Sequence, residues 1–308
     1  MTLDLCEIRV PTYRRPELLR RALRSLIDQT HRGWMAVVMD DSRDGEGEPV
    51  VRELGDARIE YRRNERRLGA AGNLDQAFVS GPLGGGAFAC VLEDDNWIER
   101  TCIAENVAAL GRSGCPVLMR DQRVWEGGGF ADRTTLGALY REGRIEPMAL
   151  HARLFFGLGA ANGALFWRTD ARSRLQVGPT VTNTVLQEHC RTLQIEEPLW
   201  FSAEPLSAWS APQGGGREIA PGPRRRLSRG RQSLHRHLWL RYGEALLPEL
   251  REIARMSQRE GRMEEHLGYI GVRLPGVATG RFLKWRLNSL LRALTTPDPL
   301  AAYFGRQV

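Results

Sequence analysis

Residues 87–97 read AFACVLEDDNW, an apolar run followed by three acidic side chains. Residues 87–92 favour a buried β-strand and a helix is expected from about 98 to 111, so the acidic group falls where the strand ends. Adjacent carboxylates repel one another and are costly to desolvate unless a cation or hydrogen-bond donors neutralise them. Mg²⁺ and Mn²⁺ prefer such oxygen ligands, often shared with a phosphate. An acidic turn that caps the next helix is the structural alternative, and this stretch alone leaves both interpretations open.

The composition is that of a soluble globular protein. Of the 308 residues, 42% are hydrophobic and 26% are charged, which is ordinary for a folded domain and argues against disorder. The length allows one large domain, or one domain with an appendage. The net charge of +7 favours anionic partners such as nucleotides, phosphates or acidic lipids.

The first half of the chain alternates strands and helices. Short apolar strands, separated by amphipathic helices, are expected at about 3–10, 35–39, 58–62 and 87–92. This pattern predicts an α/β fold with a mainly parallel sheet, in which ligands bind at the carboxyl ends of the strands. Thr12, Asp41 and the acidic group all follow strands directly. We therefore expect them to gather at one edge of the sheet.

The cysteines and the apolar segments bear on the cellular location. The five cysteines form no close pair of the zinc-ribbon or redox type, so we interpret them as reduced core residues in a reducing compartment. No signal-peptide pattern opens the chain, and no window approaches the apolar length that spans a bilayer. The expected location is the cytoplasm, either free or peripheral to the inner face of a membrane.

Five short motifs in the first 120 residues carry a resemblance to a known family. They are VPTYRRP (10–16), SLIDQT (25–30), VVMDDS (37–42), the stretch 64–73, and EDDN (93–96). In this order they resemble the successive signatures of glycosyltransferase family 2. The resemblance implies the GT-A fold, a Rossmann-like sheet flanked by helices, and a nucleotide-sugar donor.

The resemblance also implies a nucleotide site. Tyr13 would contact the base, and Asp41 would accept a hydrogen bond from uracil or thymine, although the same residue type can bind guanine. Arg66 or Arg67 would reach phosphate. Packing for Tyr13, a capped turn for Asp41 and a solvated surface for the arginines are the structural alternatives. The implied nucleotide-binding residues are Pro11, Thr12, Tyr13, Asp41, Arg67, Gly69, Asn73 and Asp94.

A divalent metal, Mn²⁺ or Mg²⁺, is implied at the acidic group, with Asp95 as the likelier direct ligand of the pair and Asp94 nearer the ribose. Such an ion would neutralise the leaving diphosphate, an effect typically worth several kcal/mol at the transition state. The predicted reaction moves a sugar from a nucleoside-diphosphate sugar, with UDP or dTDP favoured, to an acceptor hydroxyl. The acceptor is not set by the sequence, and a saccharide, a lipid-linked glycan and a natural product all stay open.

Two segments of the second half are expected to enclose the site. Residues 121–146 are rich in glycine and arginine and are expected to form a mobile loop over it. Residues 158–170 resemble the segment that lines the donor-sugar and acceptor pocket. Within it, Asn162, Gly163 and Trp167 are the implied pocket residues.

The catalytic base is the least regular part of the resemblance. In the family an acidic residue, usually in an acidic pair, opens the helix expected here at 183–193. This chain offers only Glu188, whose neighbour is Gln187. If Glu188 is the base, it contributes about 10²- to 10⁴-fold, and inversion by direct displacement is the expected outcome. An ordinary helix-surface glutamate is the alternative, and His189 is a weaker substitute base.

The expected domain organisation has three parts. Residues 1–209 would form the GT-A domain, with 1–120 as its nucleotide-binding half and 121–209 as its acceptor-binding half. Residues 210–232 are rich in glycine, proline and arginine and are expected to form a flexible linker or lid. Residues 233–308 would form a helical C-terminal region.

Two features of that region bear on partners. His235 and His237 are a further candidate for the metal shell. Helices are expected at about 233–260 and 280–294, and the second has a leucine face surrounded by arginine and lysine. We expect this face to pack on its own domain or in a homodimer, with an anionic membrane surface as the alternative.

Three other functions are weighed against glycosyl transfer. A nucleic-acid-binding protein would explain the positive charge, but the acidic group would repel phosphate and no RNA-binding motif is visible, so no nucleic acid is expected as partner. A sugar nucleotidyltransferase normally carries a glycine-rich phosphate loop after the first strand, where this chain has Pro11, Thr12 and Tyr13. A catalytically inactive relative that binds a nucleotide or another anion stays open, because the base motif departs from the family pattern.

Overall fold

The largest sheet has eight strands, in the order β3, β2, β1, β4, β10, β6, β11, β9. This computed structural model describes residues 4–211 and 221–305. β10 and β9 run antiparallel to their neighbours and the other pairs are parallel, so the predicted mainly parallel α/β sheet is confirmed. In spatial order the strands span Ile59–Arg63, Trp34–Asp40, Cys6–Thr12, Phe88–Val91, Leu165–Arg168, Val117–Arg120, Leu199–Ser202 and Gly143–Ile145.

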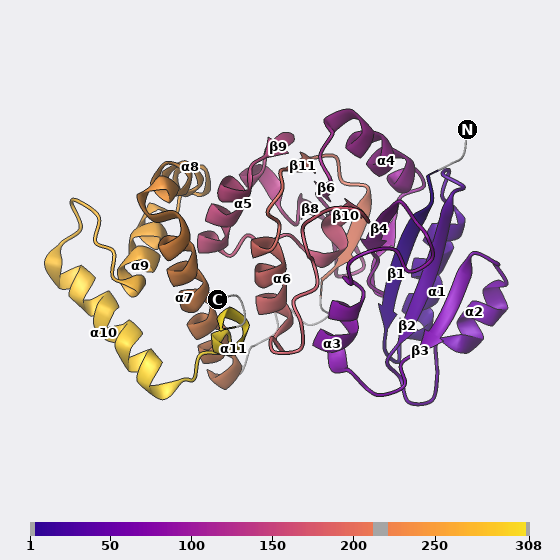
Figure 1. Cartoon of the computed structure of the whole chain (residues 1–308), viewed down its shortest axis with the longest axis horizontal. Helices are drawn as coiled ribbons and strands as arrows, with labels where there is room; N and C mark the ends of the chain where they lie inside the picture. Colours follow the sequence, from indigo (N-terminus) through magenta and orange to yellow (C-terminus); the bar gives the residue numbers. More distant parts are fainter. Residues whose placement is uncertain (1–3, 212–220, 306–308) are drawn as a thin grey trace.

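Helices cover both faces of this sheet (Figure 1). On one face, Leu19, Leu23 and Leu26 of α1 recur at helical spacing and pack with Ile8 and Val10 of β1. Residues of α2 and α4 join the same cluster, whereas α3 and α5 contribute to the cluster on the other face. The helices of this region are α1 (Pro16–Ile27), α2 (Glu48–Leu54), α3 (Gly69–Gln76), α4 (Cys102–Ser113), α5 (Pro147–Arg153) and α6 (Thr184–Leu193).

β1 also carries a buried ion pair that holds a loop. Glu7 and Arg9 are fully buried, and Nη2 of Arg9 lies 3.1 Å from Oε2 of Glu7. Both side chains bond the backbone of the segment that enters β4. The acceptors for Arg9 are the carbonyl oxygens of Ala77, Val79 and Gly81, and the donors to Glu7 are the backbone N–H groups of Leu83, Gly84 and Gly86. Because β4 leads directly into the acidic group, this pair helps to position the site.

A second sheet of four strands stands beside the first, in the order β5 (Trp97–Ile98), β12 (Ser207–Ser210), β7 (Arg123–Glu126) and β8 (Gly129–Thr134). The segment 121–146 was expected to be a mobile loop. This expectation is wrong for β7 and β8, which form a β-hairpin. Gly127 and Gly128 both have positive φ, as a tight hairpin turn requires. Trp125 and Phe130 pack across the hairpin with ring centroids 5.0 Å apart.

The C-terminal region is helical, as expected, but its boundaries differ. α7 begins at Pro221, so 221–232 is not a linker, while 212–220 lies outside the described residues. Proline is tolerated in a first helical turn, and α7 buries Leu234 and Leu238 in a cluster with Leu186 of α6. The single helix expected at 233–260 is divided near Gly243, whose φ is +55°. The helices are α7 (Pro221–Tyr242), α8 (Leu247–Ser257), α9 (Glu260–Ile270), α10 (Thr279–Thr295) and α11 (Ala301–Phe304).

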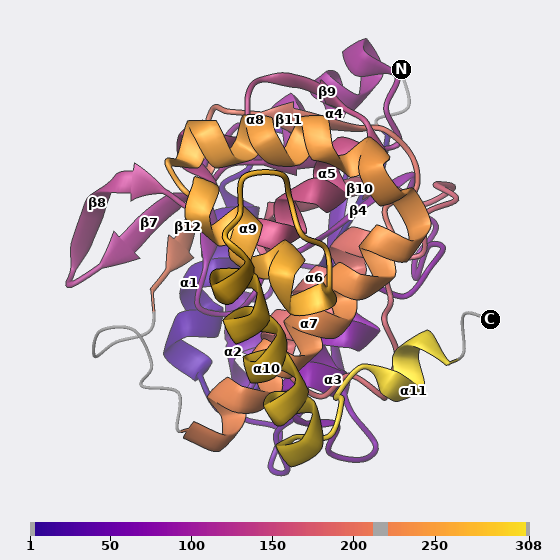
Figure 2. The same ribbon diagram turned by 90° about the vertical axis from the view of Figure 1, so that its left-hand side faces the viewer.

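α10 lies at the end of the molecule farthest from α2, against α9 (Figures 1 and 2). Trp285 packs against Gly268 of α9, where an added Cβ would lie 2.5 Å from its ring. The leucines of α10 point away from α9, toward solvent. Side chains on the opposite stripe of α10 are 51–84% exposed, so the expectation that they pack on their own domain is wrong; these are Leu283, Leu287, Leu290, Leu291 and Leu294.

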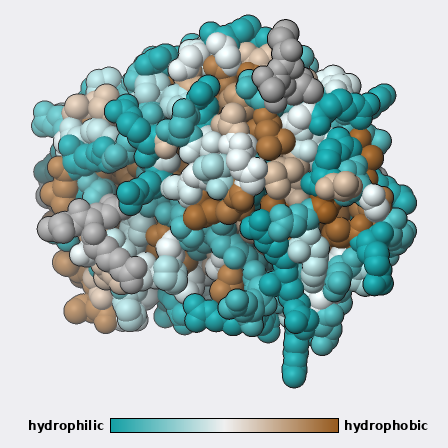
Figure 3. Space-filling model, turned by 45° about the vertical axis from the view of Figure 1, so that its right-hand side comes forward, coloured by the Kyte–Doolittle hydropathy of each residue, from teal (hydrophilic) through white to brown (hydrophobic). Residues whose placement is uncertain are grey.

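The outer surface is mostly hydrophilic on the face shown in Figure 3, with smaller hydrophobic patches between polar side chains. The five cysteines are unpaired thiols, as expected. Among residues 4–211 and 221–305, no helix is long and apolar enough to cross a membrane. Short 3₁₀ turns complete the structure at Gly137–Leu139, Leu154–Phe156, Asn162–Ala164 and Gly243–Leu246.

Candidate active site

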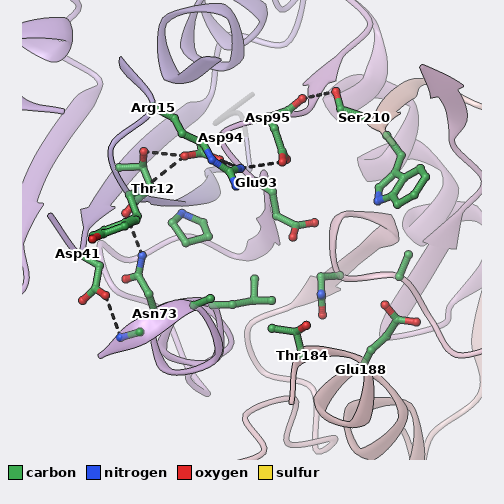
Figure 4. A pocket seen from close by; sticks show the side chains of 18 of the residues that line it. Thr12, Arg15, Asp41, Asn73, Glu93, Asp94, Asp95, Thr184, Glu188 and Ser210 are labelled. Atoms are coloured by element: carbon green, nitrogen blue, oxygen red, sulfur yellow. Dashed lines mark hydrogen bonds and ion pairs between the residues drawn. The ribbon is translucent and has the colours of Figure 1, made fainter. Parts of the chain in front are cut away.

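A cavity of about 470 Å³ opens at the carboxyl ends of β1, β2 and β4. The sequence-based expectation that separate motifs meet at this edge is met by the geometry (Figure 4). The predicted site residues that line it are Pro11, Thr12, Tyr13, Asp41, Arg67, Gly69, Asn73, Asp94, Asp95, Asn162 and Glu188.

Asp41 holds the loop that enters α3. Its carboxylate accepts hydrogen bonds from the backbone N–H groups of Leu68 and Gly69, at 2.7 and 2.8 Å, and from the side chain of Asn64 at 2.9 Å. Gly69 has a φ of +72°, a conformation that favours glycine. Asp41 thus shapes one wall of the cavity and still lines it.

Asn73 joins the ends of two strands. Its amide nitrogen donates to the carbonyl oxygens of Thr12 in β1 and Met39 in β2, both at 3.1 Å. Its oxygen accepts hydrogen bonds from Asn64 and Gln76. With its side chain engaged in these four bonds and buried, Asn73 acts on the cavity by positioning the loop after β1.

Tyr13 and Arg67 line the cavity and contact each other. The guanidinium of Arg67 lies 4.8 Å from the centroid of the Tyr13 ring, within the range of a cation–π contact. Arg14, the next residue, has a φ of +57°, which is uncommon for a residue other than glycine and often marks a functional loop. Arg66 does not line the cavity.

Asp94 and Asp95 share one cationic partner. Nη1 of Arg15 lies 3.2 Å from Oδ1 of Asp94 and 2.8 Å from Oδ2 of Asp95. The other oxygen of Asp94 accepts hydrogen bonds from the Thr12 hydroxyl at 2.8 Å and the Tyr13 backbone at 3.4 Å. Burial raises the pKa of Asp94 to about 6, although Thr12 and Arg15 oppose the rise.

Glu188 reaches the cavity from α6. A buried ion pair fixes this helix, because Arg191, fully buried, lies 3.1 Å from Asp75 of α3. Arg191 also donates to the side chain of Asn162 and to the carbonyl oxygen of Leu175. α6 and the pocket segment are therefore held to α3, and Glu188 is placed by core contacts rather than by its own hydrogen bonds.

Besides Asp94, the carboxyl groups of Glu93 and Glu188 line the cavity and have raised pKa values. Burial raises the pKa of Glu188 to about 7, against the opposing effect of Arg191 and Arg231. Burial and the neighbouring acids raise the pKa of Glu93 to about 8. Both side chains point into the cavity in Figure 4. Carboxyl groups that titrate near neutral pH suit proton transfer.

The sequence itself decides the family. The profile of glycosyl transferase family 2 matches residues 7–168, more than half of the chain. The chain belongs to glycosyltransferase family 2. The protein is therefore a glycosyltransferase, and the resemblance drawn from its five motifs is confirmed.

Solved structures agree on the GT-A fold. Residues 1–349 of S. aureus TarS match with a TM-score of 0.57 and 16% identity, over 94% of this chain and 79% of that one. The same segment in complex with UDP-GlcNAc matches with a TM-score of 0.55 and 15% identity, over 94% and 81%. A longer TarS structure matches 97% of this chain but only 50% of its own length. No curated protein matches this family 2 chain significantly.

Two implied pocket residues lie elsewhere in this glycosyltransferase. Trp167 is 4% exposed and stacks on Phe78 in the core, so its assignment to the pocket is wrong. It lies within a strand, and its side chain falls on the face that α3 covers. Gly163 lines a separate internal cavity, where a Cβ would come 3.2 Å from the amide of Gln122.

The histidine candidates also fail on position. His235 is buried and stacks on Phe155 at 4.4 Å, and His237 stacks on Phe304 at 4.3 Å. His189 is 1% exposed and faces away from the cavity lining. Burial lowers the pKa of His189 to about 3, so it is a poor proton acceptor at neutral pH.

Other lining residues were missed from sequence. Arg15 and Glu93 stand inside the motifs of the family, and their charge next to Asp94 was a usable signal. Trp209 and Ser210 carried no local sequence signal for the site, because the second sheet brings β12 to the cavity from far along the chain. Thr184 and Val185 enter with the first turn of α6.

The acidic group fits a divalent ion only in part. Oδ1 of Asp95 has no hydrogen bond within the described parts of the chain, so it is available as a ligand. Across 4–211 and 221–305, no cluster of three His, Cys, Asp or Glu side chains could hold a metal. Mg²⁺ commonly uses one or two carboxylates together with substrate phosphates and water. The residues present therefore suit an ion that arrives with a diphosphate.

Proposed function

We propose that this glycosyltransferase moves a sugar from a nucleoside-diphosphate sugar to an acceptor hydroxyl, with a divalent metal and with inversion at the anomeric carbon. The observation that carries the proposal is one cavity in which Asp41, Asp95 and Glu188 meet from three distant segments. These residues would contact the base, the diphosphate and the acceptor respectively.

A pyrimidine donor, UDP-sugar or dTDP-sugar, suits the Asp41 side of the cavity. Asp41 is 5% exposed and its Oδ2 accepts a single hydrogen bond, from Gly69. A carboxylate oxygen has room for a second donor, such as a pyrimidine N–H. The similar TarS structures include complexes with UDP and with UDP-GlcNAc, which supports the same class of donor here.

Asp95, with Asp94 beside it, would hold Mn²⁺ or Mg²⁺. When bound, the ion would act as a Lewis acid that neutralises charge on the leaving diphosphate. The chain's own cations would assist, because Arg15 and Arg67 both line the cavity. Arg15 would release Asp95 as the ion and the diphosphate arrive, and could then bind a phosphate oxygen.

Glu188 would take the proton of the acceptor hydroxyl. It lines the cavity, and in the described residues no hydrogen bond is made by its carboxylate. A base with a pKa of about 7 is well matched to neutral pH. The hydroxyl oxygen would then displace the diphosphate in one step, which inverts the anomeric carbon.

A thermal-shift panel tests the donor and the metal. UDP, dTDP, GDP, ADP and CMP would each be added with and without Mn²⁺ to the wild type, to Asp95→Ala and to the exposed control Asp132→Ala. A ligand at a hundred times its Kd adds about 2.7 kcal/mol of stability. We expect UDP or dTDP to stabilise the wild type and the control with Mn²⁺ only. Stabilisation by none of the nucleotides would favour an inactive relative and reject the proposal.

The exposed leucine stripe of α10 supports a second statement, that this end of the protein lies on an anionic membrane. α10 contains four basic residues and no acidic one: Arg281, Lys284, Arg286 and Arg292. A two-fold dimer through α10 would bring these like charges together, whereas anionic lipid complements them. A lipid-linked acceptor suits such a placement.

Vesicle co-sedimentation tests the membrane statement. We expect the wild type to bind phosphatidylglycerol vesicles more strongly than phosphatidylcholine vesicles, and Leu287→Ser with Leu291→Ser to lose most of the binding. The alternative is a homodimer. It would be supported if the wild type bound no vesicles but dimerised with increasing concentration, and if the same pair of substitutions abolished the dimer.

A further inference from the structure

A second cavity, of about 300 Å³, lies among α7, α9 and α10 and the 3₁₀ turn Leu154–Phe156. This part of the chain faces the viewer in Figure 2. The cavity shares no lining residue with the active-site cavity. Of its lining residues, Arg231 is connected to the glycosyltransferase site by its electrostatic effect on Glu188.

The walls of this cavity carry excess positive charge. Arg231, Arg262 and Arg292 line it from three different helices, and Glu265 is its one acidic residue in the described chain. Glu265 already accepts a hydrogen bond from the Tyr269 hydroxyl. Within 4–211 and 221–305 the three arginines form no ion pair. Glu188 acts on Arg231 as a partial counter-charge, and the guanidinium of Arg292 lies 5.4 Å from the centroid of the Tyr269 ring. Guanidinium groups whose charge is only partly balanced are costly where they are partly desolvated.

Arg231 is the most enclosed of the three. It lies against Gly157, where a Cβ would come 3.4 Å from its Nη2. Its Nε is buried without a hydrogen-bond partner among the described residues, and burial lowers its pKa. A bound anion would add to the partial counter-charge that Glu188 supplies.

Two neutral side chains in the same wall also lack partners. Gln232 is 5% exposed, and in the part of the chain that the structure describes neither its amide nitrogen nor its amide oxygen has a hydrogen bond. His235 is 1% exposed. Its Nε2 lies 3.2 Å from the carbonyl oxygen of Leu154, while its Nδ1 has no partner in the same described part. Since a carbonyl oxygen only accepts, Nε2 carries the proton and Nδ1 is an open acceptor.

The unpaired groups define the chemistry of a ligand. Arg231, Arg262 and Arg292 call for an anion with several acceptor oxygens, which a phosphate provides. The buried, unpaired acceptors on Gln232 and His235 call for hydroxyl donors, which would meet them once a ligand turns these side chains toward the cavity. A phosphate with no hydroxyl would leave these acceptors unsatisfied, and buried polar groups are rarely left so.

We propose that this cavity binds the phosphate monoester or diester of a small polyol, with the arginines on the phosphate and with Gln232 and His235 on the hydroxyls. Its volume is at the lower limit of small-molecule sites, which suits a group the size of glycerol phosphate. Such a group is available as a free metabolite or as the headgroup of an anionic lipid.

Titration with glycerol 3-phosphate by isothermal calorimetry tests the site on the full chain, with inorganic phosphate as the hydroxyl-poor comparison. Arg262→Ala changes an exposed side chain and should weaken binding about tenfold, the loss of about one charge-assisted hydrogen bond. Gln232→Leu should weaken binding while the unliganded protein is at least as stable as the wild type, because it removes an unsatisfied buried amide. Arg251→Ala, an exposed arginine of α8, is the matched control.

Binding to vesicles of phosphatidylglycerol and of phosphatidylcholine distinguishes the two sources of the ligand. If Arg262→Ala and Gln232→Leu weaken binding to phosphatidylglycerol as well as to glycerol 3-phosphate, the site takes the lipid headgroup; if only the soluble ligand responds, it takes a free metabolite. Both outcomes support the site.

Other results would overturn it. In the first, neither glycerol 3-phosphate nor inorganic phosphate binds, and lipid binding is unchanged by Arg262→Ala and by Gln232→Leu. In the second, Asp95→Ala abolishes binding of the soluble phosphate and Arg262→Ala does not weaken it. The second result would place the phosphate in the active-site cavity.

Discussion

Nη1 of Arg15 lies 2.8 Å from Oδ2 of Asp95, so the carboxylate expected to bind a metal is neutralised by the protein itself. The same nitrogen lies 3.2 Å from Asp94. Arg15 immediately precedes α1, and the acids follow β4, so the contact joins two loops at the edge of the sheet. A cation that binds Asp95 without a nucleotide must compete with this guanidinium.

Substitution Arg15→Ala should therefore strengthen Mn²⁺ binding to the nucleotide-free protein. We expect about a tenfold gain, which corresponds to about 1.4 kcal/mol, measured by calorimetric titration. Arg24→Ala, on the exposed side of the same helix, is the control and should change nothing. An unchanged Mn²⁺ affinity in Arg15→Ala would show that Asp95 does not hold the ion.

Substitution Glu188→Gln should lower kcat about 10²- to 10⁴-fold, because the amide cannot accept the acceptor proton. Donor binding should change little, since Asp41 and Asp95 are untouched. Steady-state assays of nucleoside diphosphate release measure both, with the exposed Glu252→Gln as control. If Glu93→Gln abolishes activity and Glu188→Gln does not, the base is Glu93.

The activity should depend on pH through Glu188, whose pKa burial raises to about 7. A general base works when deprotonated, so kcat/KM should rise with pH and level off above about 7. A pH–rate profile of the wild type measures this. A profile that falls over the same range would mean that the essential group acts as an acid.

Stability should follow the opposite direction. The pKa of Glu188 is higher in the folded state than its ordinary 4.5, so the folded state binds more protons between about pH 4.5 and 7. This contribution to stability is fully present below about 4.5 and is lost as the pH rises through about 7. Glu188→Gln should flatten the fall in Tm across that window, as measured by calorimetry. A slope identical to that of the wild type would argue against a neutral Glu188 in the folded state.

Substitution Asp41→Asn should destabilise the fold as well as the donor site. Asparagine would place an N–H₂ group against backbone donors that now bond the carboxylate. Leaving one of them unpaired costs about 1–3 kcal/mol, measurable by urea denaturation. Asp44→Asn, an exposed change in the same loop between β2 and α2, should stay within about 0.5 kcal/mol. Equal stabilities for the two variants would limit Asp41 to a binding role.

The fold and the nucleotide side of the site were accessible from sequence because their signals are local. Alternating apolar runs and helices predicted the sheet, and the ends of the strands located Asp41, Asp94 and Asp95 at one edge. Glu188 was harder to assign, because its environment depends on Arg191 and Asp75, which pair across 116 residues of chain. Trp167 was misplaced, because a strand residue reaches a pocket or a core according to the face on which it lies.

The sequence by itself determined the family, the α/β sheet and the edge at which the site forms, since hydrophobic periodicity and strand ends are properties of neighbouring residues. Only the tertiary structure decided the partners of the charged groups. It placed Arg15 on Asp95, directed Glu188 from α6 into the active-site cavity, left the α10 leucines in solvent and gathered three arginines around another cavity. The physical reason is that burial and Coulombic interaction depend on distances in space, and residues far apart in the chain set those distances only once the chain has folded.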